Sequence, residues 1–213
     1  MAELIVGALL LDLDGTLVDS TASVLRNWQK VAELLDRPGE DLVGNLHGIP
    51  GRQVLRIRAP GLSERRIEEL NQILLDGETS DTFDVVPTVG AVELLRHLPS
   101  DRWAIVTSGA RRLALARIAA AGLPVPATLV TADDVAIGKP DPEPYRLGAR
   151  LIGQPAPNCL VIEDAPAGIT SARAAGCRVL GVLTTFPRLD ADTVPDLSEL
   201  QVEVTAAGLL VRY

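Results

Sequence analysis

The chain has 213 residues, 47% of them hydrophobic, which is enough for one large domain, or for a core plus a smaller module. It carries 20 Lys and Arg residues against 28 Asp and Glu residues, a net charge of −8, and only 3% of its residues are aromatic. These values argue against a nucleic-acid partner, because nucleic-acid binding needs basic patches and stacking rings.

The first predicted element is a strand over residues 4–11 that is buried on both faces, because almost all of these residues are apolar. No basic segment precedes this run, and it ends at Asp12 after about eight residues, too short to span a bilayer. Cys159 and Cys177 form no CxxC pair and are expected to be buried thiols. We therefore predict a soluble, cytoplasmic protein with no membrane partner.

Two carboxylates, Asp12 and Asp14, stand at the end of this predicted strand, and Gly15 permits a sharp turn after them. Side chains alternate along a strand, so both carboxylates can point the same way. Charges are rarely buried unpaired. Three explanations of the pair stay open. The two carboxylates could bind a hard cation such as Mg²⁺, they could act as nucleophile and proton carrier, or the strand end could simply reach solvent.

Residues 20–83 show helical patterns and no strand signal. Apolar residues recur at helical spacing over 24–35, and a Pro-Gly pair follows them. A second short helix is expected over 52–58, and a third from an N-cap at Ser63 to Leu75. This part of the chain is predicted to be an all-helical insert.

After residue 83 short apolar runs alternate with helical segments, the pattern of βαβ units on a parallel sheet. We predict a doubly wound α/β core formed by residues 1–17 and 84–213, with the helical cap inserted at 18–83. Strands are expected over 103–107, 127–131, 159–162 and 178–183, helices over 88–97, 111–121, 141–152, 165–175 and 197–200, and an edge strand at 202–204 or 209–211.

The residues that follow these strands are the candidates for a site, because ligands of open α/β sheets bind beyond the carboxyl ends of the strands. Thr107 and Ser108 precede a helix, where a hydroxyl and free amides bind anions; a plain helix cap is the alternative. Lys139 lies in a proline-rich turn; the alternative to a role in the site is an ordinary solvated lysine. Glu163 and Asp164 follow the next strand; the alternative for Asp164 is that it only caps the following helix.

Four segments together resemble the motifs of the haloacid-dehalogenase-like phosphatases and phosphomutases, in the family's order. The segment Asp12–Ser20, DLDGTLVDS, resembles the first motif, and Thr107 stands at the second. GKPDPEPY at 138–145 resembles the third motif, and EDAPAGI at 163–169 resembles the fourth. The last of these, with VTSG at 106–109, is most similar to the sugar-phosphatase and glycerol-phosphatase branch.

The resemblance implies a role for each matching residue. Asp12 is the nucleophile that forms an aspartyl-phosphate, and Asp14 is the general acid and base. Lys139 neutralises the nucleophile and the phosphate, while Thr107 and Ser108 bind the phosphate. The resemblance also implies a Rossmann-like core with the predicted cap.

The resemblance further implies a Mg²⁺ ion held by Asp12, Asp14 and Asp164, with Asp14 using its backbone carbonyl and Glu163 binding directly or through water. Four converging carboxylates give a charge of about −4, which would repel a phosphate. Mg²⁺ and Lys139 bring the charge to about −1, and a proton on Asp14 brings it near zero.

The cap loop at 47–52 is expected to contact the substrate through His47 or Arg52, unless it is an exposed loop. Ser20 is assigned to the hinge of the cap or to an N-cap. A small cap excludes folded macromolecules, so a small phosphorylated substrate and a monomer or weak homodimer are expected.

Three functions compete. The first is a Mg²⁺-dependent phosphatase for sugar or polyol phosphates, through the aspartyl-phosphate. The second is a phosphomutase resembling β-phosphoglucomutase. Within the phosphatase class, a phosphoglycolate-type phosphatase is an alternative to the first. The third is a non-catalytic binding module. Dehalogenation is disfavoured because it has no use for the acids that bind Mg²⁺.

Overall fold

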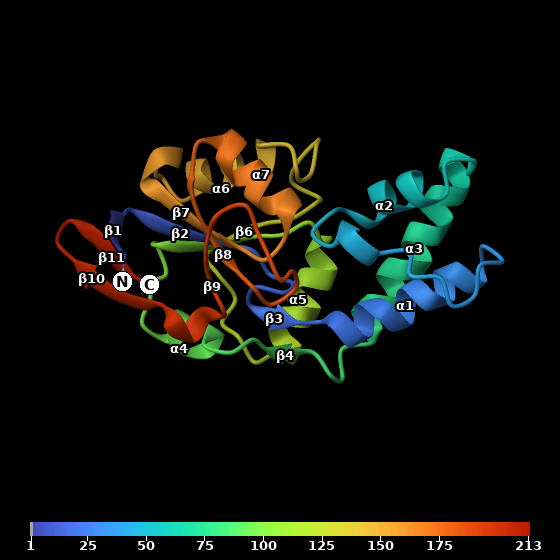
Figure 1. Ribbon diagram of the computed structural model, residues 1–213, viewed down its shortest axis with the longest axis horizontal. Helices are drawn as coiled ribbons and strands as arrows, with labels where there is room; N and C mark the ends of the chain where they lie inside the picture. The colour runs from blue at the N-terminus through green and yellow to red at the C-terminus, as the bar shows by residue number, and fades with distance from the viewer. Residues whose placement is uncertain (1) are drawn as a thin grey trace.

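The computed structural model describes residues 2–213, except for the side chain of residue 45. A six-stranded parallel sheet forms its centre, in the order β6-β5-β2-β7-β8-β9 (Figure 1). The chain runs outward from β2 in both directions, which confirms the doubly wound core. The strands are β2 (Ala8–Leu11), β5 (Trp103–Val106), β6 (Thr128–Val130), β7 (Cys159–Glu163), β8 (Arg178–Val182) and β9 (Asp192–Val194).

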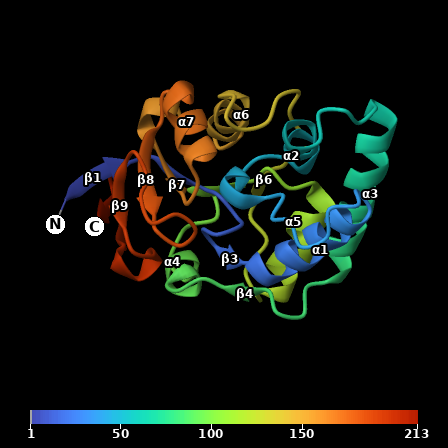
Figure 2. The same ribbon diagram turned by 45° about the vertical axis from the view of Figure 1, so that its right-hand side comes forward.

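Helices cover both faces of this sheet, with α6 and α7 on one side and α4 and α5 on the other (Figure 2). The residues of β2 alternate between the two interiors: Leu9 and Leu11 pack with α4 and α5, while Ala8 and Leu10 pack with α6 and α7. A central strand buried on both faces explains its continuous apolar sequence. The helices are α4 (Ala91–Arg96), α5 (Arg111–Ala120), α6 (Glu143–Leu151) and α7 (Pro166–Ala175), with short 3₁₀ turns η2 (Ala156–Asn158) and η3 (Leu197–Glu199).

The single strand predicted over 4–11 is wrong, because the chain breaks at Gly7. Residues Glu3–Val6 form β1, which pairs antiparallel with β11 (Gly208–Arg212) beside β10 (Gln201–Thr205), in a separate three-stranded sheet. A Cβ at Gly7 would collide with the ends of the Gln154 and Asn158 side chains, so a larger residue there would require both to move. The predicted edge strand near the C-terminus therefore belongs to this second sheet.

The cap consists of α1 (Thr21–Glu33), η1 (Gly44–Leu46), α2 (Gly51–Arg58) and α3 (Glu64–Ser80). These helices share an apolar cluster of their own, centred on Trp28, Leu55 and Leu70, and lie at one end of the molecule (Figure 1). The Ser63 hydroxyl accepts a hydrogen bond from the amide of Arg66, which confirms the predicted N-cap of α3. The helix ends at Ser80 and not at the predicted Leu75.

The two passages between cap and core lie side by side, because β3 (Val18–Asp19) pairs antiparallel with β4 (Val86–Pro87). Ser20 does not cap α1; its hydroxyl donates instead to Asp14 at 2.7 Å. The domain boundaries at 17–18 and 83–84 stay a prediction. Within residues 2–213, none of the helices has the length and apolar character needed to cross a bilayer.

Candidate active site

The predicted site residues meet where neighbouring parallel strands end. Asp12 follows β2 directly, Thr107 follows β5, and Glu163 and Asp164 lie at the end of β7. Since β2 pairs with both β5 and β7, these four positions are adjacent at one edge of the sheet. Parallel pairing alone brings together segments that are about 150 residues apart in the chain.

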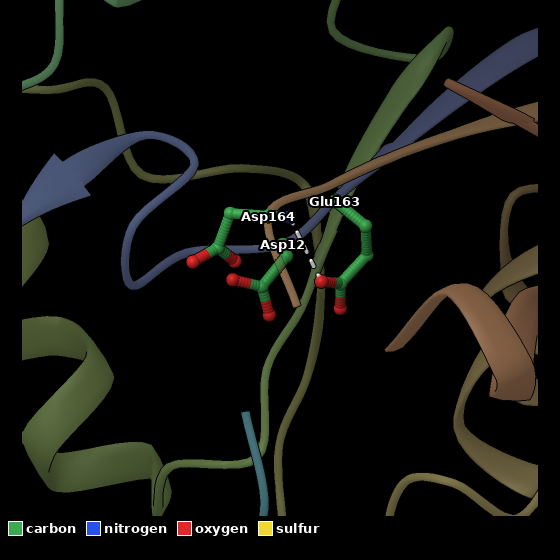
Figure 3. A group of neighbouring side chains, drawn as sticks. All are labelled: Asp12, Glu163 and Asp164. Carbon is green, nitrogen blue, oxygen red and sulfur yellow. Dashed lines mark hydrogen bonds between the residues drawn. The ribbon is translucent and has the colours of Figure 1, made fainter. Parts of the chain in front are cut away.

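Three buried carboxylates form a cluster at this edge. Asp12, Glu163 and Asp164 each offer an oxygen, and these oxygens lie within 4.8 Å of one another. In Figure 3 the carboxylate of Asp12 lies beside that of Asp164, with Glu163 on its other side. Such a set of hard oxygen donors suits a divalent cation such as Mg²⁺.

Lys139 is fully buried and places its ammonium group among the carboxylates. It donates to Asp12 Oδ1 at 2.5 Å, to Glu163 Oε1 at 2.7 Å and to the carbonyl of Val106 at 2.9 Å. Burial opposes its charge, but Asp12 and Glu163 raise the pKa of Lys139 above its ordinary value. The alternative of a solvated lysine is therefore wrong.

One cation does not balance the cluster. Burial raises the pKa of the Asp12 carboxyl to about 7, although Lys139 acts in the opposite direction. Burial, Glu163 and Asp12 together raise the pKa of Asp164 well above its usual range. A divalent cation would oppose these shifts and keep both carboxylates ionised. The donor set and its excess negative charge therefore both fit Mg²⁺.

Each oxygen of the Glu163 carboxylate accepts two hydrogen bonds from the protein. Its Oε1 accepts from Lys139 and from the hydroxyl of Tyr145, and its Oε2 accepts from the amides of Asp164 and Ala165. Of the two predicted modes, this arrangement favours contact with the cation through water. Tyr145 was not predicted as a site residue, although it ends the GKPDPEPY segment.

Replacing Gly168 with Ala tests how closely the site is packed. A Cβ at residue 168 would collide with the Glu163 carboxylate, so Gly168→Ala must displace the group that holds Lys139. We expect a loss of about 1–3 kcal/mol of unfolding free energy, measured by urea denaturation, together with a lower kcat. Ala167→Gly in the same turn of α7 is the comparison variant: it adds no volume beside Glu163, and it should cost at most about 1 kcal/mol and leave kcat unchanged. A stable, fully active Gly168→Ala protein would contradict this packing.

Asp14 is not part of this group of three carboxylates, and its side chain has other partners. Its Oδ1 accepts from the Ser20 hydroxyl at 2.7 Å and forms an ion pair with Nη1 of Arg117 at 2.8 Å. Gly15 has a φ of +86°, which turns the chain directly after Asp14. The two aspartates therefore have different surroundings, and the predicted contact of the Asp14 carbonyl with Mg²⁺ stays a prediction.

The helix-cap alternatives for the other site residues are wrong. Helix α5 has Ala110 as its N-cap residue and α7 has Ala165, and neither helix has a side-chain cap. Thr107 Oγ1 accepts from the Gly109 amide at 3.0 Å, while the Ser108 hydroxyl donates to the carbonyl of Gly48 in the cap at 2.8 Å. Ser108 thus links the core to the cap loop.

A cavity of about 220 Å³ lies between the core and the cap. Asp12, Asp14 and Thr107 line its core side, while Trp28 and Leu74 belong to its apolar cap side. A small molecule with one anionic end suits this distribution of polar and apolar walls.

The two predicted cap residues also line this cavity. The His47 ring packs edge-on against Phe186, and burial lowers the pKa of His47, which favours a neutral ring. Arg52 pairs with Glu68 at 2.8 Å, and both side chains are more than half exposed. Their contact with a substrate stays a prediction.

Two further residues of the cavity wall were not predicted. Arg117 of α5 and Glu78 of α3 are buried, and they form an ion pair with each other beside Asp14. Burial raises the pKa of Glu78 to about 7, against the effect of Arg117. Neither residue belongs to a motif, and a charge on a helix is usually solvated, so the sequence carries no local signal for them.

Comparison with known proteins agrees with this geometry. The family model of the haloacid dehalogenase-like hydrolases matches residues 6–176. The chain belongs to this family. The family predicted from the four motifs is thereby confirmed, and the match extends from β1 through the cap to the end of α7.

Curated relatives include phosphatases of small polyol phosphates. Hexitol phosphatase A of Escherichia coli (strain K12) is 42% identical over 91% of this chain and 88% of its own length. Glycerol-1-phosphate phosphohydrolase 2 of Saccharomyces cerevisiae is 33% identical over 85% and 76%. Beta-phosphoglucomutase of Bacillus subtilis (strain 168) is 30% identical over 92% of both chains. The family and these phosphatase relatives identify the chain as an enzyme, a phosphoric monoester hydrolase of the haloacid dehalogenase-like family.

Proposed function

We propose that this hydrolase is a Mg²⁺-dependent phosphatase that removes phosphate from small sugar or polyol phosphates through an aspartyl-phosphate on Asp12. The observation that carries the proposal is the placement of Asp12, which is buried beside Asp164 and Lys139 and lines the cavity. The names of the phosphatase relatives support a polyol or sugar phosphate as substrate.

In the first step a carboxylate oxygen of Asp12 attacks phosphorus, and the bond between phosphorus and the leaving oxygen breaks. Asp14 donates a proton to that oxygen, so the product leaves as a neutral alcohol. In the second step Asp14 takes a proton from water, and the resulting hydroxide attacks phosphorus and releases phosphate from Asp12. Lys139 stays charged throughout and balances the charge on Asp12 and on the phosphoryl group.

Mg²⁺ would be held by Asp12 and Asp164, with the carbonyl of Asp14 and with Glu163 through water, and it supplies charge neutralisation for the phosphoryl group. Thr107 and the amide of Ser108 would bind the remaining phosphate oxygens. His47 and Arg52 are proposed to hydrogen-bond the alcohol part of the substrate.

A panel assay tests the substrate class. Phosphate release is measured with hexitol phosphates, glycerol phosphate, hexose phosphates and phosphoglycolate as substrates. We expect the highest kcat/KM with a polyol or sugar phosphate; a preference for phosphoglycolate would contradict the proposal.

The mutase is a second candidate function, because a beta-phosphoglucomutase is among the relatives. A mutase must keep water from the phospho-aspartate while the intermediate turns round. Incubation with a hexose 1-phosphate and its bisphosphate decides between the two: we expect net phosphate, whereas an isomeric hexose phosphate without net phosphate would establish the mutase.

Removal of the metal should abolish turnover, because the acidic cluster then repels a phosphate ester. Dialysis against a chelator is expected to lower activity to background, and added Mg²⁺ to restore it. Asp164→Asn should raise the Mg²⁺ concentration for half-maximal activity by about 10–100-fold, whereas Asp190→Asn on the exposed surface should not. Unchanged activity after chelation would contradict the metal site.

We further propose a cytoplasmic location, which two free, buried cysteines fit, and a monomer or weak homodimer. The oligomeric state is measured by sedimentation equilibrium; a tight tetramer would contradict that part of the proposal.

A further inference from the structure

A single buried arginine joins the cap to Asp14. Arg117 of α5 contacts Asp14 through Nη1 at 2.8 Å and Glu78 of α3 through Nη2 at 2.5 Å. Helix α3 belongs to the cap and α5 to the core, and the two helices are in contact (Figure 1). The side chains of Arg117 and Glu78 are only 4% and 7% exposed.

The ion pair between Arg117 and Glu78 is an energetically unfavourable choice for packing α3 against α5. Buried ion pairs often contribute less to stability than apolar residues of similar volume. Arg117 Nε is also buried with no hydrogen-bond partner among residues 2–213, and buried polar atoms of this kind are uncommon. Such a cost points to a role other than stabilising the contact between α3 and α5.

The contacts of the Asp14 carboxylate involve only one of its two oxygens. Both Ser20 and Arg117 approach its Oδ1, and no hydrogen bond among the described residues reaches its Oδ2. Asp14 lines the cavity, and its Oδ2 is the oxygen that these two contacts leave unused. Arg117 is held between Asp14 and Glu78, so its contact with Glu78 fixes the guanidinium that pairs with the Asp14 carboxylate.

We propose that Glu78 is a positioning residue for the proton transfer by Asp14: the docked cap presents Glu78 to Arg117, and Arg117 then fixes the Asp14 carboxylate toward the leaving oxygen. The assembled cap thereby completes the proton-transfer site. This inference rests on the proposed function, in which Asp14 protonates the leaving group.

The test compares two esters of similar shape that differ in their need for an acid. 4-Nitrophenyl phosphate has a leaving group that departs without a proton, whereas phenyl phosphate depends more on protonation. Neither carries the hydroxyls of a sugar, so a lost contact between Glu78 and substrate hydroxyls would not change the comparison. The readout is the ratio of kcat/KM for 4-nitrophenyl phosphate to kcat/KM for phenyl phosphate.

Asp14→Asn supplies the reference, and we expect it to raise this ratio by about 100-fold. Glu78→Gln keeps the shape of the side chain and should raise the ratio by about tenfold. Asp76→Asn is the matched control, because Asp76 also joins α3 to α5, through an exposed ion pair with Arg112, and does not contact Asp14. It should leave the ratio unchanged.

The outcomes separate the inference from the function on which it rests. If Asp14→Asn raises the ratio and Glu78→Gln lowers kcat/KM for both esters equally, or changes neither, the positioning role is wrong and the proposed function stands. If Asp14→Asn leaves the ratio unchanged, Asp14 is not the acid, and both the positioning role and the protonation step of the proposed mechanism are wrong. Absence of turnover of either ester by the unmodified protein would instead refute the proposed function itself. Should Glu78→Gln fail to fold by circular dichroism, Arg117→Lys, which keeps the charge but loses the two-sided contact, is expected to raise the ratio and takes its place.

Discussion

Asp12→Asn is expected to lower kcat/KM for a small phosphate ester by about 10⁴-fold or more, because an amide does not replace the carboxylate nucleophile. Asp12 contacts Lys139 and lies within the acidic cluster, so the change removes the attacking oxygen and also weakens the ion pair with Lys139 and the proposed metal site. Initial-rate kinetics at saturating Mg²⁺ measure the effect.

Asp19→Asn is the matched control for this variant. Asp19 belongs to the same sequence motif but is exposed, and it accepts a hydrogen bond from the amide of Thr21, which an asparagine oxygen also does. Its activity should stay within about threefold of the unmodified protein. An Asp12→Asn protein with activity comparable to this control would exclude the nucleophilic role.

Lys139→Met is expected to lower the free energy of unfolding by about 3–5 kcal/mol in the absence of Mg²⁺. Methionine has a similar length but no charge, so Asp12 and Glu163 would stay buried without their cation. Urea denaturation in the presence of a chelator measures the change. Turnover should be lost as well, because the charge that balances the phosphoryl group is missing.

Lys30→Met on α1 is the corresponding control, since Lys30 is an exposed residue whose ammonium donates to Asn27 Oδ1. It should change the free energy of unfolding by less than about 1 kcal/mol. If Lys139→Met were no more destabilising than Lys30→Met, the buried ion pairs of Lys139 would not hold the acidic cluster together.

The sequence predicted the doubly wound core, the cap and the segments that supply the site because each has a local signal. Apolar runs mark the strands, and polar residues at their ends must meet once the strands are parallel. The separation of β1 from β2 has no such signal, because it depends on pairing with β11, about 200 residues away. Only Gly7, inside an apolar run, marks the break.

Within the site, the contacts of Asp14 could not be predicted for the same reason. Arg117 lies in the middle of an Ala- and Leu-rich helix, and Glu78 lies on a helix that was expected to end at residue 75. Each looks like a surface charge until the cap folds against the core. The motifs identify residues that carry chemistry, whereas the residues that orient them come from tertiary packing.

The most direct test of the account is to find the phosphoryl group on the protein. A reaction with substrate and Mg²⁺ is quenched within milliseconds, reduced with borohydride, which converts an aspartyl-phosphate to homoserine, and digested for mass spectrometry. The account predicts homoserine at residue 12 in the peptide that contains DLDGTLVDS, and none after Asp12→Asn. Homoserine at another aspartate, or turnover with no modified residue at any quench time, would contradict it.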